Sequence, residues 1–399
     1  MAEKVATTYI NRKLSPGDVV LGQYKIIKEI ARGGMNSIIY LAEDTRVKSD
    51  DYFALENKNV AVKIIAKNET VNESDWKKFH EEIETAARIS DKKFLNDLNV
   101  KNIARFIASG IEDDDQTIIY VMEYINGPSL RKLIEREGYL NLNEAVFFFR
   151  HMLMAVRELH RSKDKTIHRD LKPENFLLSK DLTYIKVIDY GISTTFYSKT
   201  RGYTKKIVGD EDQIYGTYPY ISPDILLMKD AVTEDDKIKI ITEQFDFFSL
   251  GVIFYEMLIG EKPFYSDNYD DVKVIKLPLT YDMLCLNDLD PNIPNGIENI
   301  IFRCMASKKE DKHFRYNTIE EIISDLDKYR SDPSASFNEK LLKPKSMRVF
   351  QTKVLFNVQK EKDKQGLFEQ LWWIWLVIGI ITVTLTIVIV LLIVDKWTS

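Results

Sequence analysis

Short apolar runs separated by polar turns fill the first third of the chain. Their alternation of apolar and polar positions is typical of β-strands. Strands are therefore expected over residues 23–30, 37–42, 60–63 and 117–122, the last of them paired with one further strand across an acidic turn at 112–116. These segments predict a small β-rich unit.

Apolar residues at helical spacing become prominent further along the chain. They predict helices over residues 73–90, 129–137 and 142–161. Asn141 or Asn143 can cap the last of these helices at its N-terminus, because a side-chain oxygen there accepts from a backbone N–H of the first turn. Helices and loops are expected for most of the segments that follow.

An uninterrupted apolar stretch lies near the C-terminus. Residues 371–394 carry no charge and consist almost entirely of Leu, Ile, Val, Trp and Thr. As a helix they would reach about 36 Å, which is enough to cross a bilayer with some tilt. Tryptophans flank the stretch as in an interfacial aromatic belt: Trp372, Trp373, Trp375 and Trp397. We expect a transmembrane helix, since a buried soluble helix of this length, the alternative, normally keeps a polar face.

The segment before this stretch is basic. Between Glu339 and Lys364, eight Lys and Arg residues outweigh three acidic ones, a balance of +5. Basic residues beside a span are attracted to anionic lipid and favour the cytoplasmic side. The sequence therefore predicts a single-pass protein of the cell membrane, with a basic linker at 332–370, a short external tail at 395–399, and the remainder in the cytoplasm.

Composition narrows the class of protein further. The chain has 399 residues, with 56 Lys and Arg against 61 Asp and Glu, and its net charge of -5 argues against nucleic acid as a partner. Cys285 and Cys304 are the only cysteines, too few for a disulfide framework or a zinc site. Residues 1–20 are expected to be a short lead-in, and they lack the apolar core of a signal peptide.

Candidate catalytic groups cluster in residues 168–175, His-Arg-Asp-Leu-Lys-Pro-Glu-Asn. This segment lies between the helix expected at 142–161 and a strand expected at 184–188, so Asp170 should sit on a loop, a usual place for catalytic groups. Pro173 supports a loop over a helix, because proline cannot donate a backbone hydrogen bond.

The residue types in this segment suit phosphoryl transfer. That reaction needs a base near the acceptor hydroxyl, a cation near the moving phosphoryl group, and oxygen ligands for magnesium. Asp170 offers a carboxylate, Lys172 offers an ammonium group, and Asn175 and Asp189 offer oxygen atoms. A charged surface loop that carries these residues by chance is the alternative, but a second motif, Asp-Tyr-Gly at 189–191, argues against it.

The two motifs together resemble those of the eukaryotic-type serine/threonine protein kinases, in their bacterial form. Residues 168–175 match the catalytic-loop pattern H-R-D-x-x-x-x-N, and residues 189–191 are similar to D-F-G. The resemblance implies that Asp170 is the base, that Lys172 is the cation near the moving phosphoryl group, and that Asn175 and Asp189 hold the metal. The resemblance covers about residues 22–330. It implies an α+β, bilobal kinase domain at about 21–331, with ATP and Mg²⁺ or Mn²⁺ as cofactors. The β-rich small lobe would end near residue 124, and the helical large lobe would follow from about 125.

The resemblance also implies how the phosphates of a nucleotide are held. Residues 60–63, Val-Ala-Val-Lys, are similar to the V-A-I-K strand whose lysine grips the α and β phosphates, here Lys63. Its expected partner is Glu82 on the helix at 73–90, with Glu81 and Glu84 as alternatives.

The adenine would be bound where the two lobes join. Main-chain groups of Glu123 and Ile125 would hydrogen-bond the base, with Met122 behind it; an ordinary strand end is the alternative. The complete set of expected nucleotide-binding residues is Ile30, Ala31, Arg32, Gly33, Gly34, Met35, Asn36, Ser37, Ile38, Ala61, Lys63, Glu82, Met122, Glu123 and Ile125.

The turn expected over residues 31–36 departs from the family pattern G-x-G-x-x-G-x-V. Ala31 and Asn36 stand where that pattern has glycines, and only Gly33 matches a patterned one. A glycine-containing turn between strands lets backbone N–H groups approach phosphate oxygens.

A hydroxyl-rich segment after Gly191 resembles an activation loop, although a polar disordered loop is the alternative. Arg169 would lie beside it, ready to pair with a phosphate. The candidate autophosphorylation sites are Thr194, Thr195, Thr200 and Thr204.

Residues 216–224 are similar to the G-T-x-x-Y-x-x-P-E segment that lies under the peptide substrate. Asp224 stands where the family has Glu and is expected to pair with Arg315. Because Asp is one methylene shorter, the pair is expected to be strained or bridged by a water molecule. Thr217 and Lys172 together favour Ser or Thr over Tyr as the acceptor.

The expected function is that of a membrane-anchored serine/threonine kinase that phosphorylates proteins and itself. Asp246, in a segment similar to D-x-W-S-L-G, would hold the catalytic loop. The alternative is an inactive pseudokinase scaffold, suggested by the altered glycine turn and Asp224. Against it, the groups needed for transfer are all present: Lys63, Asp170, Asn175 and Asp189. Protein substrates and the membrane are the expected partners, and a homodimer is left open.

Overall fold

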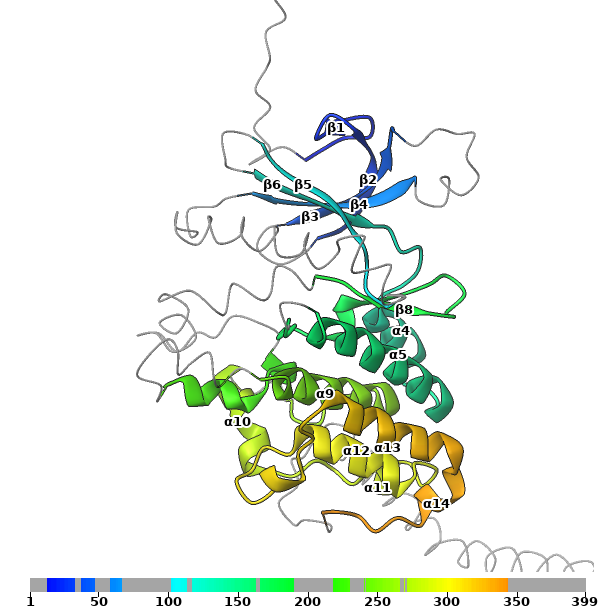
Figure 1. Cartoon of the computed structure of the whole chain (residues 1–399), viewed down its shortest axis with the longest axis vertical. Coiled ribbons are helices and arrows are strands. Elements are labelled where there is room, and N and C mark those ends of the chain that lie inside the picture. Colours follow the sequence, from blue (N-terminus) through cyan, green and yellow to red (C-terminus); the bar gives the residue numbers. More distant parts are fainter. Residues whose placement is uncertain are drawn as a thin grey trace, which may run out of the picture.

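The computed structural model describes residues 13–343, apart from 33–36, 47–57, 67–101, 113–116, 163–165, 190–217, 230–239, 241, 266–268 and 270. A sheet forms one lobe and helices form the other (Figure 1). This confirms the predicted bilobal α+β architecture. Three predicted segments lie outside the described residues: the helix at 73–90, the hydroxyl-rich segment at 192–204 and the apolar stretch at 371–394. Within the described ranges, no helix is long and apolar enough to cross a membrane.

The small lobe is a six-stranded antiparallel sheet in the order β1-β2-β3-β4-β6-β5. Its strands are β1 Val19–Val20, β2 Tyr24–Arg32, β3 Ile38–Asp44, β4 Asn59–Ala66, β5 Phe106–Glu112 and β6 Thr117–Glu123. The expected strands are confirmed, but the turn expected from Ala31 was placed too early. Ala31 and Arg32 still pair with Ile39 and Ile38, because the ladder between β2 and β3 continues past two irregularities in register.

Strand β6 lies inside the sheet, with β4 on one side and β5 on the other, and both of its faces are covered. Ile119 and Val121 belong to one apolar cluster, whereas Tyr120 belongs to a second cluster on the opposite face. Alternation along a strand places Ala61 and Lys63 of β4 on the same face of the sheet. Ala61 belongs to the second cluster, so Lys63 projects on that side.

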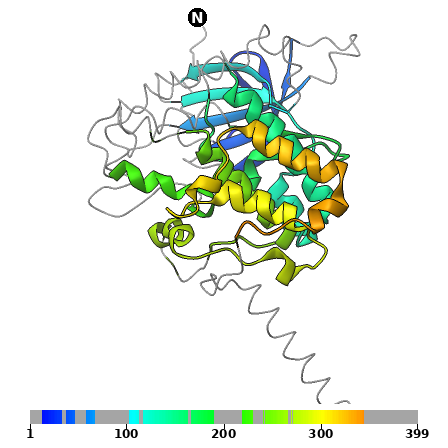
Figure 2. The ribbon, with the colours of Figure 1, turned by 60° about the horizontal axis from the view of Figure 1, so that its bottom comes forward.

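The large lobe is built around α9, Gln244–Ile259, of which fourteen residues are buried. Phe254 of α9 stacks on Phe149 with 4.0 Å between ring centroids. The other helices are α4 Leu130–Glu137, α5 Leu142–His160, α10 Asp271–Thr280, α11 Leu286–Leu289, α12 Asn295–Met305, α13 Ile319–Ser331 and α14 Pro333–Phe337. Helices α12 and α13 lie side by side and are coloured yellow and orange in Figure 2.

Short elements connect these helices. They are the 3-10 turns η1 Pro173–Asn175, η2 Tyr218–Tyr220, η3 Pro223–Lys229 and η4 Lys312–Phe314, and the antiparallel hairpin of β7 Phe176–Leu178 and β8 Ile185–Val187. Asn141, and not Asn143, caps α5: its side chain accepts from the N–H of Glu144, whose carboxylate accepts in return from Asn141.

The end of the domain differs from the prediction, because the linker expected from residue 332 begins in a folded segment. The Asp332 carboxylate accepts from the N–H of Ala335 at 3.0 Å and caps α14. Beyond that helix, the amide of Asn299 on α12 donates to the carbonyl of Lys340 at 3.1 Å and accepts from the N–H of Leu342 at 2.9 Å. These tertiary contacts tie this segment, which was expected to belong to the linker, to the large lobe.

Candidate active site

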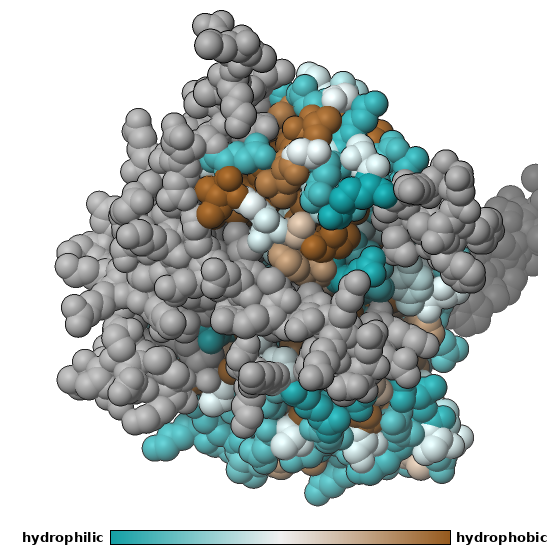
Figure 3. All heavy atoms as spheres, turned by 45° about the horizontal axis from the view of Figure 1, so that its top comes forward, coloured by the Kyte–Doolittle hydropathy of each residue, from teal (hydrophilic) through white to brown (hydrophobic). Residues whose placement is uncertain are grey.

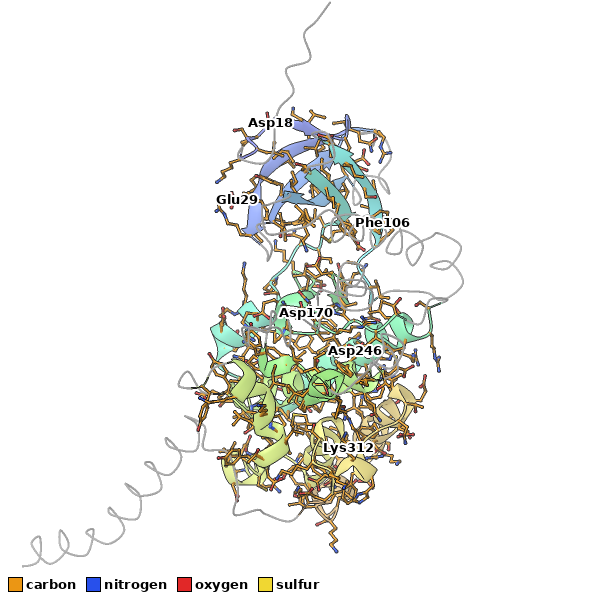
Figure 4. All side chains as sticks on the ribbon, turned by 90° about the vertical axis from the view of Figure 1, so that its left-hand side faces the viewer. Asp18, Glu29, Phe106, Asp170, Asp246 and Lys312 are labelled. Carbon is orange, nitrogen blue, oxygen red and sulfur yellow. The ribbon has the colours of Figure 1, made fainter. Side chains whose placement is uncertain are left out.

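The catalytic segment is attached to the large lobe by Asp246, which lies at the start of α9. Asp246 is fully buried, and its carboxylate accepts from the N–H of His168 at 2.8 Å and from the N–H of Arg169 at 2.7 Å. Figure 4 shows Asp246 below Asp170, on the side of the helices. Two charge-assisted bonds to consecutive backbone groups thus hold the two residues that precede Asp170.

Two residues of the site have left-handed backbone conformations: φ is +66° at Arg169 and +59° at Asp189. Such a conformation is costly for residues other than glycine and persists where the surroundings impose it. At Arg169 the bond from its N–H to Asp246 is part of that constraint. The strain falls directly before Asp170 and on the first residue of the Asp-Tyr-Gly motif.

His160, at the C-terminal end of α5, supports the same carboxylate. Its Nε2 donates to Asp246 Oδ2 at 2.8 Å, and its Nδ1 lies 3.5 Å from Glu243. Burial alone would lower the pKa of His160, but the bond to Asp246 and the nearby carboxylate of Glu243 outweigh it and raise that pKa to about 9. Burial opposes ionisation of Asp246 as well, yet its bond to His160 holds the Asp246 pKa below the ordinary value. A buried ion pair therefore underlies the catalytic loop.

The predicted catalytic side chains face one another. Lys172 Nζ lies 2.7 Å from Asp170 Oδ2, and the amide of Asn175 donates to the backbone carbonyl of Asp170 at 2.8 Å. Pro173 begins a 3-10 turn here instead of an open loop, because a proline at the first helical position loses no hydrogen bond and has a suitable φ. The turn folds Asn175 back towards Asp170.

Lys63 reaches this group from the small lobe. Its strand neighbours are Ile39 and Tyr120, and its Nζ lies 2.9 Å from Asp189 Oδ2. Burial opposes ionisation of Asp189, but the charge and hydrogen bond of Lys63 hold the Asp189 pKa below its usual value. Glu82, the expected partner of Lys63, lies outside the described residues.

Asn175 and Asp189 are also brought together. The N–H of Ile188, the neighbour of Asp189, donates to the Asn175 carbonyl at 2.9 Å. Because the Asn175 amide nitrogen is bound to Asp170, its side-chain oxygen is the atom that it would offer to a cation. One carboxylate and one amide oxygen are the ligands that Mg²⁺ takes alongside substrate phosphates, so the pair fits such an ion. In the described part of the chain, no three His, Cys, Asp or Glu side chains form a metal site by themselves.

The junction between the lobes offers main-chain groups that an adenine could bind, and it also contains an ion pair. Glu123 uses its N–H to donate to the Arg105 carbonyl at 2.8 Å, so its own carbonyl is the group that an adenine could bind. The Ile125 carbonyl accepts from Gly127 at 3.1 Å, which leaves the N–H of Ile125 for the same purpose. The Glu123 carboxylate binds Lys186 of β8 at 2.7 and 2.8 Å. That ion pair joins the last strand of the small lobe to the large lobe and was not predicted.

The remaining nucleotide-site residues are placed in part. Ile30, Ala31 and Arg32 end β2, Ser37 directly precedes β3, and Ile38 begins it. Ala61 and Met122 are cross-strand neighbours in β4 and β6. Residues 33–36, including the patterned Gly33, lie outside the described residues. The same holds for Thr217 and the candidate phosphorylation sites Thr194, Thr195, Thr200 and Thr204.

Asp224 and Arg315 form a direct ion pair, so no bridging water is needed where Asp replaces Glu. Both are buried, and Lys312 adds a second cation 3.2 Å from Asp224. Arg315 also donates to Ser222 at 3.3 Å and to the Gln244 carbonyl at 3.1 Å. The shorter side chain is accommodated because η3 carries Asp224 close to the arginine.

Sequence reasoning did not identify the partners of two residues that support the site, His160 and Arg131. The local pattern around His160 shows only the end of an apolar helical stripe, and its partner lies 86 residues away. Arg131 lies on an ordinary amphipathic helix, yet it contacts Glu174 of the catalytic loop, Glu256 of α9 and Tyr220 of η2. No short motif marks either residue.

Comparisons with known proteins agree with this geometry. The family model described as protein kinase domain matches residues 51–347. An inferred serine/threonine-protein kinase of Mycoplasma genitalium is 34% identical over 350 residues, 86% of this chain and 87% of that protein. A corresponding protein of Mycoplasma pneumoniae is 31% identical over 85% of this chain and 86% of its own length. The serine/threonine-protein kinase PrkC of Bacillus subtilis is 29% identical over 78% of this chain and 41% of its own length.

A small sheet and a helical lobe joined by the Lys63–Asp189 contact, with Lys172 bound to Asp170 in the helical lobe, have the arrangement of a phosphotransferase of the kinase type. The chain belongs to the protein kinase family. It is a serine/threonine protein kinase of the bacterial kind, as the sequence motifs indicated.

Proposed function

We propose that this kinase transfers the γ-phosphoryl group of ATP to Ser and Thr hydroxyls of proteins while anchored to a membrane by residues 371–394. The convergence of four polar side chains from distant parts of the chain supports the transfer step. Lys63 contacts Asp189, Ile188 contacts Asn175, and Asn175 contacts Asp170. This connected set contains the cation, metal ligands and base that the reaction needs.

The side chains have separate roles in this proposal. Asp170 orients the acceptor hydroxyl and takes its proton, and Lys172 lies on the Asp170 carboxylate, where it can steady the transferred group. Lys63 grips the phosphates once ATP competes for it, exchanging its bond to Asp189 for bonds to phosphate oxygens. Asn175 and Asp189 would hold Mg²⁺, which supplies charge neutralisation at the phosphates.

Replacement of Asp170 by Asn tests the transfer step. The amide keeps the shape of the carboxylate but cannot take a proton, so transfer from radiolabelled ATP should fall at least about a hundredfold, the size typical of a lost general base. Binding of a fluorescent ATP analogue should be retained. Asp327→Asn on the exposed face of α13 is the matched control and should transfer normally. Equal activity in Asp170→Asn would refute the role of Asp170.

Autophosphorylation belongs to the same proposal. The four candidate threonines follow Arg169 and the Asp-Tyr-Gly motif in the chain, and a phosphate on one of them could pair with that arginine. Phosphopeptide mapping after incubation with ATP should find at least one of them modified in the wild type and none in Asp170→Asn. Modification exclusively at other residues would refute this part.

The membrane part of the proposal rests on the length and composition of residues 371–394 and on the basic segment before them. Fractionation of cells that express the full chain should place it with the membranes, and high salt should not release it. A variant that ends at residue 370 should be released. Equal recovery of the two proteins in the soluble fraction would refute the anchor.

A further inference from the structure

One arginine joins four elements of the large lobe. Arg131 lies in the first turn of α4, and its Nε donates to Glu174 of the catalytic loop at 2.9 Å. Its Nη1 donates to Glu256 of α9 at 2.9 Å, and its Nη2 donates to the hydroxyl of Tyr220 in η2. The planar guanidinium carries its donors in a fixed fork and can therefore bind several acceptors at once. We call the site formed by Glu174, Glu256 and Tyr220 around Arg131 the acidic recess.

The recess has a deep end and an open end. Side-chain exposure is 2% for Glu256, 16% for Arg131 and 44% for Glu174, so Arg131 extends from a buried carboxylate to one at the surface. Tyr220 adds a bond from its hydroxyl to Glu256, and Lys262 lies 3.5 Å from the same carboxylate. Two carboxylates are thus balanced by two cations, all from this chain.

The recess lies next to the reacting groups. Glu174 is four residues from Asp170 and belongs to the 3-10 turn that positions Asn175. Four residues of chain span at most about 14 Å, so Glu174 lies within reach of the first few residues of a peptide that places its hydroxyl on Asp170 and extends in that direction. A cationic side chain on such a peptide would be attracted to Glu174 and Glu256 if Arg131 did not already bind them.

We propose that Arg131 is a specificity-determining residue. It fills a recess that would otherwise bind, and so select, a basic side chain of the acceptor peptide. This inference rests on the proposed function. The preferred acceptors are Ser- and Thr-containing segments that need no Arg or Lys beside the phosphorylated residue. Neutralisation is the physical reason, because a peptide cation gains little from carboxylates that already share an internal guanidinium.

A purely structural role for Arg131 is the competing explanation. Its loss would then lower stability or the rate with every peptide equally, because the bonds to Glu256 and Tyr220 also fasten α4 to α9. The ratio of rates for two peptides separates the explanations, since it is unaffected by a general loss of active enzyme.

The experiment compares acceptor peptides that differ only in Arg against Gln, scanned over about four residues on each side of one Ser. The full-length enzyme should phosphorylate the members of each pair with kcat/KM values within about threefold. Arg131→Met should prefer the Arg peptide by about tenfold or more for at least one scanned residue, because Glu174 and Glu256 are then unmasked. Arg131→Met/Glu174→Gln should lose most of that preference, because the outer carboxylate has been removed.

Arg131→Gln provides a second route if the Met variant is too unstable, since its amide can still donate to Glu256 or Tyr220 without a charge. It should show the same gain in preference. An unchanged Arg-to-Gln ratio in both variants, or a strong preference for Arg already in the wild type, would overturn the assignment. Failure of the wild type to phosphorylate any peptide or protein would overturn the proposed function itself and this inference with it.

Discussion

Lys63 belongs to a six-stranded sheet, whereas Asp170 belongs to a segment with little regular backbone hydrogen bonding of its own. The direction of the Lys63 side chain is set by the alternation of side chains along β4, which is paired with a strand on each side. The loss of one polar contact would not change that direction. Asp170 is aimed by a strained backbone at Arg169 and by the buried carboxylate of Asp246. One half of the site therefore depends on regular structure and the other on a few buried polar groups.

This difference predicts how substitutions in each lobe affect stability and activity. Regular strands distribute their stabilisation over many backbone bonds, while a buried polar network fails when one member is removed, because the remaining groups keep their desolvation cost. Substitutions in the network should damage stability and activity together. Substitutions of the strand lysine should damage activity alone.

The largest effect on stability is expected for Asp246→Asn. His160 would lose the carboxylate whose bond raises its pKa, and burial would then disfavour its charged form. An asparagine would also replace a charged acceptor for the N–H groups of His168 and Arg169 with a neutral one. We expect the free energy of unfolding to fall by about 3–5 kcal/mol, measured by urea denaturation of the large-lobe transition. A loss below about 1 kcal/mol would show that the catalytic loop is not attached mainly through Asp246.

The pH dependence of stability should report on the same network. His160 has a raised pKa, about 9 against an ordinary 6.5, so the folded protein binds more protons than the unfolded chain between these values. Its contribution is complete below pH 6.5 and is lost as the pH rises through 9, and it amounts to at most about 3 kcal/mol.

His160→Gln is the variant that isolates this contribution. It should be less stable than the wild type below pH 6.5, and the gap should narrow towards pH 9 in denaturation curves taken across the range. Burial also raises the pKa of Glu158, to about 7, which makes stability fall between pH 4.5 and 7. His160→Gln should still show this fall of stability between pH 4.5 and 7, because Glu158 is unchanged. A gap that does not change with pH would show that His160 is neutral in the folded protein.

Lys63→Met tests the other half of the comparison. Asp189 would lose its cation, but its side chain is 21% exposed and can be reached by water, and the strand pairing of β4 would remain. We expect stability to change by about 1 kcal/mol or less, in either direction, while phosphoryl transfer falls at least about a hundredfold. Loss of stability as large as that of Asp246→Asn would remove the distinction between the lobes.

The smallest effect is expected at the junction of the lobes. Glu123→Gln removes the ion pair with Lys186, in which both side chains are partly exposed, so the cost should be about 0.2–1 kcal/mol. Glu43→Gln, which breaks a surface pair with Lys58 within the small lobe, is the matched control. If the Glu123 pair restrains the lobes, Glu123→Gln alone should change the KM for ATP; identical KM values in both variants would exclude such a restraint.

Apolar side chains are exposed on the sheet of the small lobe. Figure 3 shows brown side chains on the sheet, and Val19 and Ile111 on its two edge strands are 48% and 44% exposed. The edges themselves are in contact, since the N–H of Leu21, next to β1, donates to Glu112 of β5 at 2.9 Å. Contact between the edge strands limits the open backbone that an edge would offer to another chain.

Periodicity and motifs in the sequence were enough to establish the lobes and most of the chemistry. Alternation identified β4 and placed Lys63 on it, and helical spacing with a capping asparagine identified α5. The resemblance of residues 168–175 and 189–191 to the kinase motifs indicated phosphoryl transfer and implied a task for Asp170, Lys172 and Asn175. Such features are local, and a short stretch of sequence contains all of the information that they need.

Only the tertiary structure decided how the loop is held and how its charges are balanced. Asp246 and His160 are 86 residues apart, and Arg131 and Glu256 are 125 residues apart, so no local pattern could pair them. The fold of residues 332–343 was hidden for the same reason, because Asn299 on another helix binds their backbone. A buried charge can be retained only next to its partner, and which groups become neighbours depends on how the helices pack.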